Sequence, residues 1–224
     1  MAEYSIGPID IQGHSNKPVP NRLFRNVGPA NGLAILFPGL RYSCDMPLFF
    51  YPMKLMLQRG FDVLQLHADY TSPAFSQASP DRQIDWLGSD AWAAVEAASS
   101  QRSYDSCLLM GKSIGTLAQS VLLLEHPDLR SNPTIWLTPL FRLPLIEQAT
   151  QQLNGPALYV AGTGDTTYDA NRLDYLKHNN AAETLIFEDA DHSLEIPGNL
   201  DESLVTLQKF VQGMADFIDR SVLA

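Results

Sequence analysis

The sequence has few cysteines, few positive charges and no long apolar run. Only Cys44 and Cys107 occur in 224 residues, which excludes a disulfide framework and a cysteine-built metal cage. No apolar run approaches the ~20 residues of a membrane span, and the N-terminal residues lack the basic and apolar regions of a secretory signal. We therefore expect a soluble cytoplasmic protein.

Positive charge is in deficit: 15 Lys and Arg stand against 25 Asp and Glu, for a net charge of -10. A negative surface repels nucleic-acid phosphate and anionic lipid, so neither is an expected partner. The chain is 45% hydrophobic and 18% charged, which is typical of a globular protein. We expect residues 1–224 to form a single domain, and the composition indicates no particular oligomeric state.

Apolar runs alternate with segments of helical periodicity along most of the chain. This alternation predicts an α/β fold, with a mostly parallel twisted sheet and helices on both faces. The first ~25 residues are compatible with an antiparallel pair at the sheet edge, and 69–81 is a long loop rich in proline and serine. The expected strands are 32–39, 61–68, 106–112, 134–139, 157–165 and 183–190, and the expected helices are 46–60, 81–100, 113–127, 140–155, 170–180 and 199–223.

Residues 107–119, CLLMGKSIGTLAQ, contain two overlapping motifs. A phosphate-binding loop of the form G-x-x-x-x-G-K-[ST] requires a glycine at position 106, where this chain has Ser106. The four following residues form an apolar run that belongs inside a sheet, so no loop remains to surround a phosphate. This argues against a nucleotide site.

The second motif is G-x-S-x-G, which forms a nucleophile elbow when it joins a buried strand to a helix. Ser113 would lie at the apex, between Gly111 and Gly115, where a side chain would strike neighbouring backbone in so tight a turn. The alternative is a glycine-flanked helix start with Ser113 as the N-cap.

An elbow serine needs a base and an acid, and both have candidates at later strand ends. Asp165 follows the strand expected at 157–165, although Asp169 competes with it unless Asp169 begins the next helix. His192 follows the last expected strand. His67 also lies at a strand end and could line a pocket, but it precedes the elbow. The remaining histidines, at helix ends or in the N-terminal region, are His14, His126 and His178.

The segments "GKSIG", "GTGD" and "DHS" follow one another in the order nucleophile, acid, base. In this the chain resembles the α/β-hydrolase family, from about Gly32 to the C-terminus. The resemblance implies a catalytic triad of Ser113, Asp165 and His192, and it favours Asp165 over Asp169.

The resemblance also implies an oxyanion hole built from the backbone N–H groups of Ile114 and Leu40. Many relatives have His-Gly before the second donor, where this chain has Pro38 and Gly39. Lys112 precedes the nucleophile, and its amine either lowers the electrostatic cost of a nearby anion or points at solvent.

Other side chains at expected strand ends are candidates for substrate binding. They are Arg41, Tyr42, Phe141, Arg142 and Tyr168. Either arginine could hold a carboxylate or phosphate on the substrate, or be a solvated surface residue.

Residues 140–156 have room for about one helix, so no large cap domain is expected. The site would be open, or covered only by the loops 41–48 and 69–81. The sequence thus predicts a serine hydrolase that cleaves a small soluble ester or thioester through an acyl-enzyme. Its partner is a small-molecule acyl substrate, and the mechanism needs no metal or organic cofactor. The alternatives are an acyltransferase or C–C bond hydrolase with the same triad, or a non-catalytic small-molecule binding module.

Overall fold

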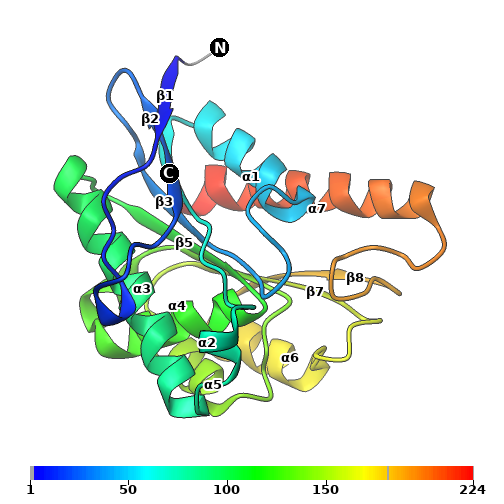
Figure 1. Cartoon of the computed structure of the whole chain (residues 1–224). Coiled ribbons are helices and arrows are strands. Elements are labelled where there is room, and N and C mark those ends of the chain that lie inside the picture. Colours follow the sequence, from blue (N-terminus) through cyan, green and yellow to red (C-terminus); the bar gives the residue numbers. More distant parts are fainter. Residues whose placement is uncertain (1–2, 181, 224) are drawn as a thin grey trace.

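A single eight-stranded sheet runs through the computed structural model, which describes residues 3–180 and 182–223 (Figure 1). The strand order is β1-β2-β4-β3-β5-β6-β7-β8. The strands are β1 (Tyr4–Gly7), β2 (Asn21–Asn26), β3 (Gly32–Phe37), β4 (Phe61–Leu66), β5 (Cys107–Lys112), β6 (Thr134–Leu137), β7 (Ala157–Gly162) and β8 (Glu183–Phe187).

The six strands from β3 to β8 pair in parallel, and β1 and β2 join β4 as an antiparallel edge. The expected mostly parallel sheet is confirmed, and the antiparallel pair anticipated near the N-terminus is present. Five of the parallel strands are buried along almost their whole length, as apolar runs covered on both faces must be.

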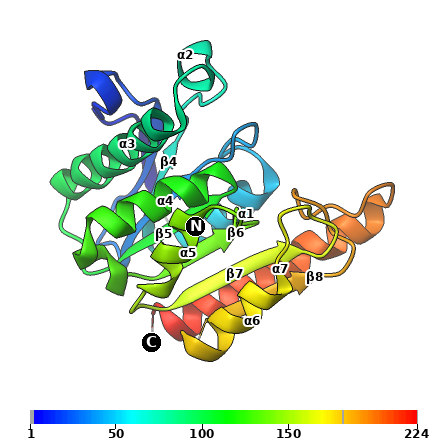
Figure 2. The same ribbon diagram turned by 90° about the horizontal axis from the view of Figure 1, so that it is seen from below.

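Helices cover the sheet on both sides, which completes the predicted three-layer arrangement (Figure 2). They are α1 (Pro47–Gln58), α2 (Pro73–Ser76), α3 (Pro80–Gln101), α4 (Ile114–Glu125), α5 (Pro144–Gln151), α6 (Ala170–Asn179) and α7 (Leu200–Ser221), with short 3-10 turns η1 (His14–Asn16) and η2 (Pro127–Ser131).

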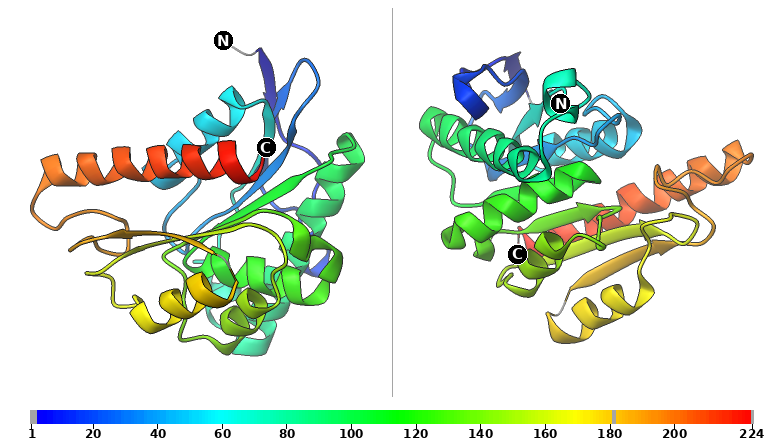
Figure 3. Two further views of the ribbon diagram at one scale, coloured as in Figure 1. Left: turned by 180° about the vertical axis from the view of Figure 1, so that it is seen from behind. Right: turned by 60° about the horizontal axis from the view of Figure 1, so that its bottom comes forward.

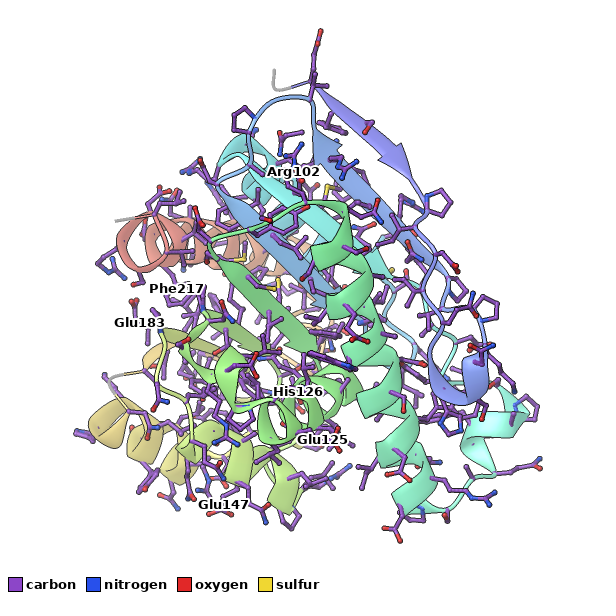
Figure 4. All side chains as sticks on the ribbon, turned by 90° about the vertical axis from the view of Figure 1, so that its left-hand side faces the viewer. Arg102, Glu125, His126, Glu147, Glu183 and Phe217 are labelled. Atoms are coloured by element: carbon purple, nitrogen blue, oxygen red, sulfur yellow. The ribbon has the colours of Figure 1, made fainter. Side chains whose placement is uncertain are left out.

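Two helices, α1 and α7, lie side by side on one face of the sheet (Figure 3). Apolar side chains such as Phe49 and Phe217 fill the layer beneath them, and Figure 4 labels Phe217. The other face is covered by α3, α4, α5 and α6, over a core that includes Trp136 and Tyr159. Each face thus has its own hydrophobic layer, with the sheet between them.

Most expected elements agree with the structure to within three residues at each end, and two segments differ more. The helix expected at 140–155 is only α5, Pro144–Gln151, because Pro144 lacks the N–H of a helix interior and stands at its first turn. The loop expected at 69–81 contains the single-turn helix α2. In the described part of the chain, no helix is both long and apolar enough to cross a membrane.

Candidate active site

The turn between β5 and α4 holds Ser113 in a strained backbone conformation. Its φ of 52° and ψ of -118° lie outside the regions that L-residues favour. The turn is held by the Ser113 N–H, which donates to the Leu137 carbonyl at 3.0 Å, and by Thr116, whose N–H donates to the Ser113 carbonyl at 2.8 Å. Such strain is typical of functional sites, where the surrounding structure overrides the local preference.

The two glycines of the motif permit this turn because other backbone passes very close to them. A Cβ on Gly115 would lie 2.1 Å from the Phe37 carbonyl oxygen, and one on Gly111 would lie 2.6 Å from the Gly115 carbonyl oxygen. Both separations are well below contact distance. The glycines are therefore explained by close backbone approach, and residues 107–112 form a strand rather than a loop that could surround a phosphate.

The loops after β7 and β8 bring Asp165 and His192 together. His192 Nδ1 lies 2.7 Å from Asp165 Oδ2, and the N–H and hydroxyl of Thr167 donate to the same carboxylate at 2.8 and 2.9 Å. Burial by itself raises the pKa of Asp165, but the hydrogen bonds from His192 and Thr167 outweigh burial and leave the pKa below its usual value. Asp165 is therefore an ionised, nearly buried carboxylate that orients the imidazole.

The competing residue Asp169 lies at the start of α6 and does not contact His192 in the described structure. Its carboxylate accepts a hydrogen bond from the Arg172 N–H at 3.0 Å, which is the role of a helix N-cap.

Ser113 and His192 lie at the same edge of the sheet, connected through the residue next to the serine. Lys112 Nζ donates to the main-chain carbonyl of His192 at 2.9 Å. Within residues 3–180 and 182–223, the Ser113 hydroxyl and the imidazole do not hydrogen-bond with each other directly. Hydrogen bonds between nucleophile and base often tighten only when substrate binds, so the lack of a direct bond does not argue against proton transfer.

Leu40 and Ile114 both line one cavity of about 280 Å³. Neither backbone N–H of the two donates to any residue that the structure describes. Two unused donors beside a strained serine form an arrangement that can receive a developing negative charge. The cavity is lined by Leu40, Arg41, Tyr70, Thr71, Phe75, Ser76, Gln83 and Ile114.

The predicted substrate-binding residues fall into two groups. Arg41 and Tyr42 follow Leu40 in the chain. Arg41 lines the cavity above, and both residues line a neighbouring one of about 240 Å³, which His67 also lines. Phe141, Arg142 and Tyr168 line neither of these two cavities.

Each member of the second group has a different surrounding. Phe141 is buried against Tyr159, Arg142 is exposed, and the Tyr168 N–H donates to the Asp165 carbonyl. The contribution of these three residues to substrate binding stays a prediction.

The structure answers the question about Lys112, which does not point at solvent. The residue is 1% exposed, and burial lowers its pKa to about 8. The sequence pattern could have predicted this burial. Alternate residues of a strand share a face, and Leu108 and Met110, which share the face of Lys112, face the layer under α1 and α7.

Comparisons with known proteins match the chain at the level of structure only. No family model and no curated protein sequence matches it. The protein Est1E from Butyrivibrio proteoclasticus, solved with ferulic acid bound, is 14% identical at a TM-score of 0.70, covering 98% of this chain and 100% of that one.

Two further solved structures also match over nearly their whole length. A dienelactone hydrolase from Anabaena variabilis is 17% identical at a TM-score of 0.70, covering 98% of each chain. A putative α/β hydrolase of unknown function from Agrobacterium tumefaciens is 17% identical at 0.68, covering 97% of this chain and 95% of that one.

Proposed function

We propose that this chain, which has an α/β-hydrolase fold, is a serine hydrolase that cleaves a small soluble ester or thioester. The observation that carries the proposal is the 2.7 Å contact between Asp165 and His192, at the sheet edge where Ser113 is strained. The similar solved structures support hydrolysis in general, because two of them are described as a dienelactone hydrolase and a putative α/β hydrolase. A cytoplasmic location stays a prediction from sequence.

The reaction follows from the roles that these groups can take. His192 accepts the proton of the Ser113 hydroxyl as the serine oxygen attacks the substrate carbonyl carbon. The negative charge that develops on the carbonyl oxygen is stabilised by the N–H groups of Leu40 and Ile114. The imidazolium, held by Asp165, then donates its proton to the leaving alkoxide or thiolate, and an acyl-enzyme remains.

Water completes the cycle by the same route in reverse. His192 removes a proton from a water molecule, the resulting hydroxide attacks the acyl carbon, and the proton returns to Ser113 as the carboxylic acid leaves. His192 therefore carries the proton in both half-reactions: it takes the proton from Ser113 or water, and gives it to the leaving group or back to Ser113.

Substrate size follows from the space beside the two N–H donors. The cavity there is about 280 Å³, which is at the lower end of the usual range of ligand sites. The segment between β6 and β7 holds only the eight-residue helix α5, as expected for a chain without a large cap. We therefore expect short acyl groups to react faster than long ones.

The decisive experiment is labelling with a fluorophosphonate probe. Wild type and a Ser100→Ala control, on the exposed surface of α3, should label at equal rates, whereas Ser113→Ala should not label. Labelling of Ser113→Ala at the wild-type rate would remove Ser113 from the mechanism. A series of p-nitrophenyl esters and acyl-CoA thioesters from two to eight carbons then measures the chain-length preference, and an added alcohol acceptor measures acyl transfer against hydrolysis.

A further inference from the structure

Lys112 is a buried cation that the proposed chemistry does not use. It ends β5 immediately before Ser113, and its side chain lies in the layer under α1 and α7. Nζ donates to the His192 carbonyl at 2.9 Å and to Thr138 Oγ1 at 3.3 Å, and it lies 4.6 Å from the centre of the Tyr42 ring. One ammonium thus connects the ends of β5 and β6 with the loops after β3 and β8.

This cation has no ion-pair partner among the described residues, although negative charges act on it from a distance. Asp165 and Asp191 favour its charged form, but burial outweighs them. Burial raises the pKa of Tyr42 to about 12, so the ring against the ammonium is neutral. The titratable groups that face Lys112 or its Tyr42 partner are Tyr42, Asp165, Asp191, His192 and Glu195.

An unpaired buried charge is costly, and a Met or Leu would fill the same space without that cost. The contact that the charge makes is specific: it holds the backbone of the residue whose imidazole contacts Asp165. Asp191 closes the same loop, with its carboxylate accepting the N–H groups of Ser193 and Glu195 at 2.7 and 3.1 Å. The base is therefore held at its side chain by Asp165 and at its main chain by Lys112.

We propose that Lys112 is a positioning residue, whose ammonium fixes the His192 main chain so that the imidazole stays within proton-transfer reach of the Ser113 hydroxyl. The inference rests on the proposed function and adds a residue to it. Lys112 makes and breaks no bond: the proton passes only between Ser113, His192 and the leaving group or water. Displacements of about 1 Å in such a constellation cost roughly 100-fold in rate.

Two substitutions separate position from charge. Lys112→Met removes both hydrogen bonds while keeping a flexible chain of similar length, whereas Lys112→Gln keeps a donor without charge. Lys54→Met is the matched control, because Lys54 also lies over an aromatic ring, 5.6 Å from the centre of Phe50, but is exposed on α1. Each variant is measured at pH 7 with the preferred ester, together with its fluorophosphonate labelling rate and its melting temperature.

For Lys112→Met we expect kcat and the labelling rate to fall about 10- to 100-fold, as loss of hydrogen bonds from a charged donor implies. KM should change less than about threefold, because Lys112 lines neither cavity beside Leu40. Lys112→Gln should recover part of the loss, and Lys54→Met should match wild type.

The pH dependence of kcat distinguishes a positioning role from a merely structural one, because a structural lysine would not change it. Above pH 8 the wild-type ammonium loses its proton, and a neutral amine donates a weaker hydrogen bond. We therefore expect wild-type kcat to fall roughly fivefold as pH rises through about 8. Lys112→Gln, which has no proton to lose there, should lack this alkaline limb.

The outcomes distinguish this inference from the proposed function. If Ser113 is labelled but Lys112→Met and Lys112→Gln show wild-type kcat, the positioning role is wrong and the hydrolase stands. If Ser113 is not labelled, both are wrong. Should both Lys112 variants fail to fold, the wild-type profile decides, because a kcat that stays flat to pH 9.5 overturns the inference.

Discussion

Two deeply buried charges at opposite ends of the parallel strands, Asp62 and Lys112, differ in how they are paired. At the amino edge, which is where the parallel strands begin, Asp62 at the start of β4 is fully buried and surrounded by hydrogen-bond donors. Its carboxylate accepts the Asn26 N–H at 2.8 Å and the Tyr104 hydroxyl at 2.8 Å, and it forms an ion pair with Arg102 at 3.2 Å (Figure 4 labels Arg102). At the carboxyl edge, Lys112 is as deeply buried but has no ion pair in the described chain.

Backbone strain follows the same division. Six described non-glycine residues have positive φ. Four of them, with φ from 42° to 58°, follow the carboxyl ends of β5, β6 or β8: Ser113, Thr138, Asp189 and Leu194. The other two, Ser15 and Asn16, lie in η1. Each such residue costs of order 1–3 kcal/mol. The comparison teaches that the amino edge is built for stability, whereas the carboxyl edge gives up stability at the candidate site.

The largest expected effect tests the carboxyl edge. Asp165→Asn removes the charge that orients His192 and should lower kcat about 10³–10⁴-fold, because the imidazole is no longer held in the required tautomer. Steady-state kinetics at pH 7 measure the loss. Asp169→Asn is the matched control: asparagine caps helices as well as aspartate does, so its kcat should equal that of wild type. If both variants kept full activity, Asp165 would have no part in the reaction.

The next effect tests the amino edge. Asp62→Ala leaves Arg102, Asn26 and Tyr104 without their buried partner, so the free energy of unfolding should fall by about 3–5 kcal/mol. Urea denaturation measures the change. The control Asp45→Ala breaks only the exposed ion pair with Arg22, and should cost under about 1 kcal/mol.

The kcat of the Asp62→Ala variant tests the difference between the two edges further. At temperatures where Asp62→Ala stays folded, its kcat should match wild type, because Asp62 lies at the opposite edge from Ser113. A large fall in kcat with little loss of stability would contradict the proposed division.

The smallest expected effect concerns Lys112 and the stability of the fold. Its folded-state pKa of about 8 lies below the ordinary 10.5, so between these values the unfolded chain binds more protons than the folded one. Wild-type stability should therefore receive a rising contribution from Lys112 between pH 8 and 10.5, by up to about 3 kcal/mol. Lys112→Met should lack this contribution, which paired urea titrations at pH 7 and pH 10 measure. A rise that is equal in both proteins would assign it to other groups.

Much of the fold could be predicted from sequence because the pattern that indicates each element lies within a short stretch of chain. The apolar run 32–37 and the strand-turn-helix pattern around Ser113 depend on neighbours within about 20 residues. The helix expected at 140–155 was too long, because the periodic pattern includes residues before Pro144, which stands in the first turn of α5. The oxyanion and triad assignments came from resemblance and stay predictions, and the Ser113 and Asp165 variants test two members of the triad.

By itself, the sequence determined the alternation of strands and helices, and therefore a parallel sheet whose chemistry gathers at the carboxyl edge. The reason is that hydrophobic periodicity and turn residues act over short stretches of chain. Only the tertiary structure decided which aspartate meets His192, and that Lys112 turns inward beneath the His192 loop. Those contacts join residues 27 and 80 positions apart, and they arise only when the packed sheet brings separate strand ends to one edge.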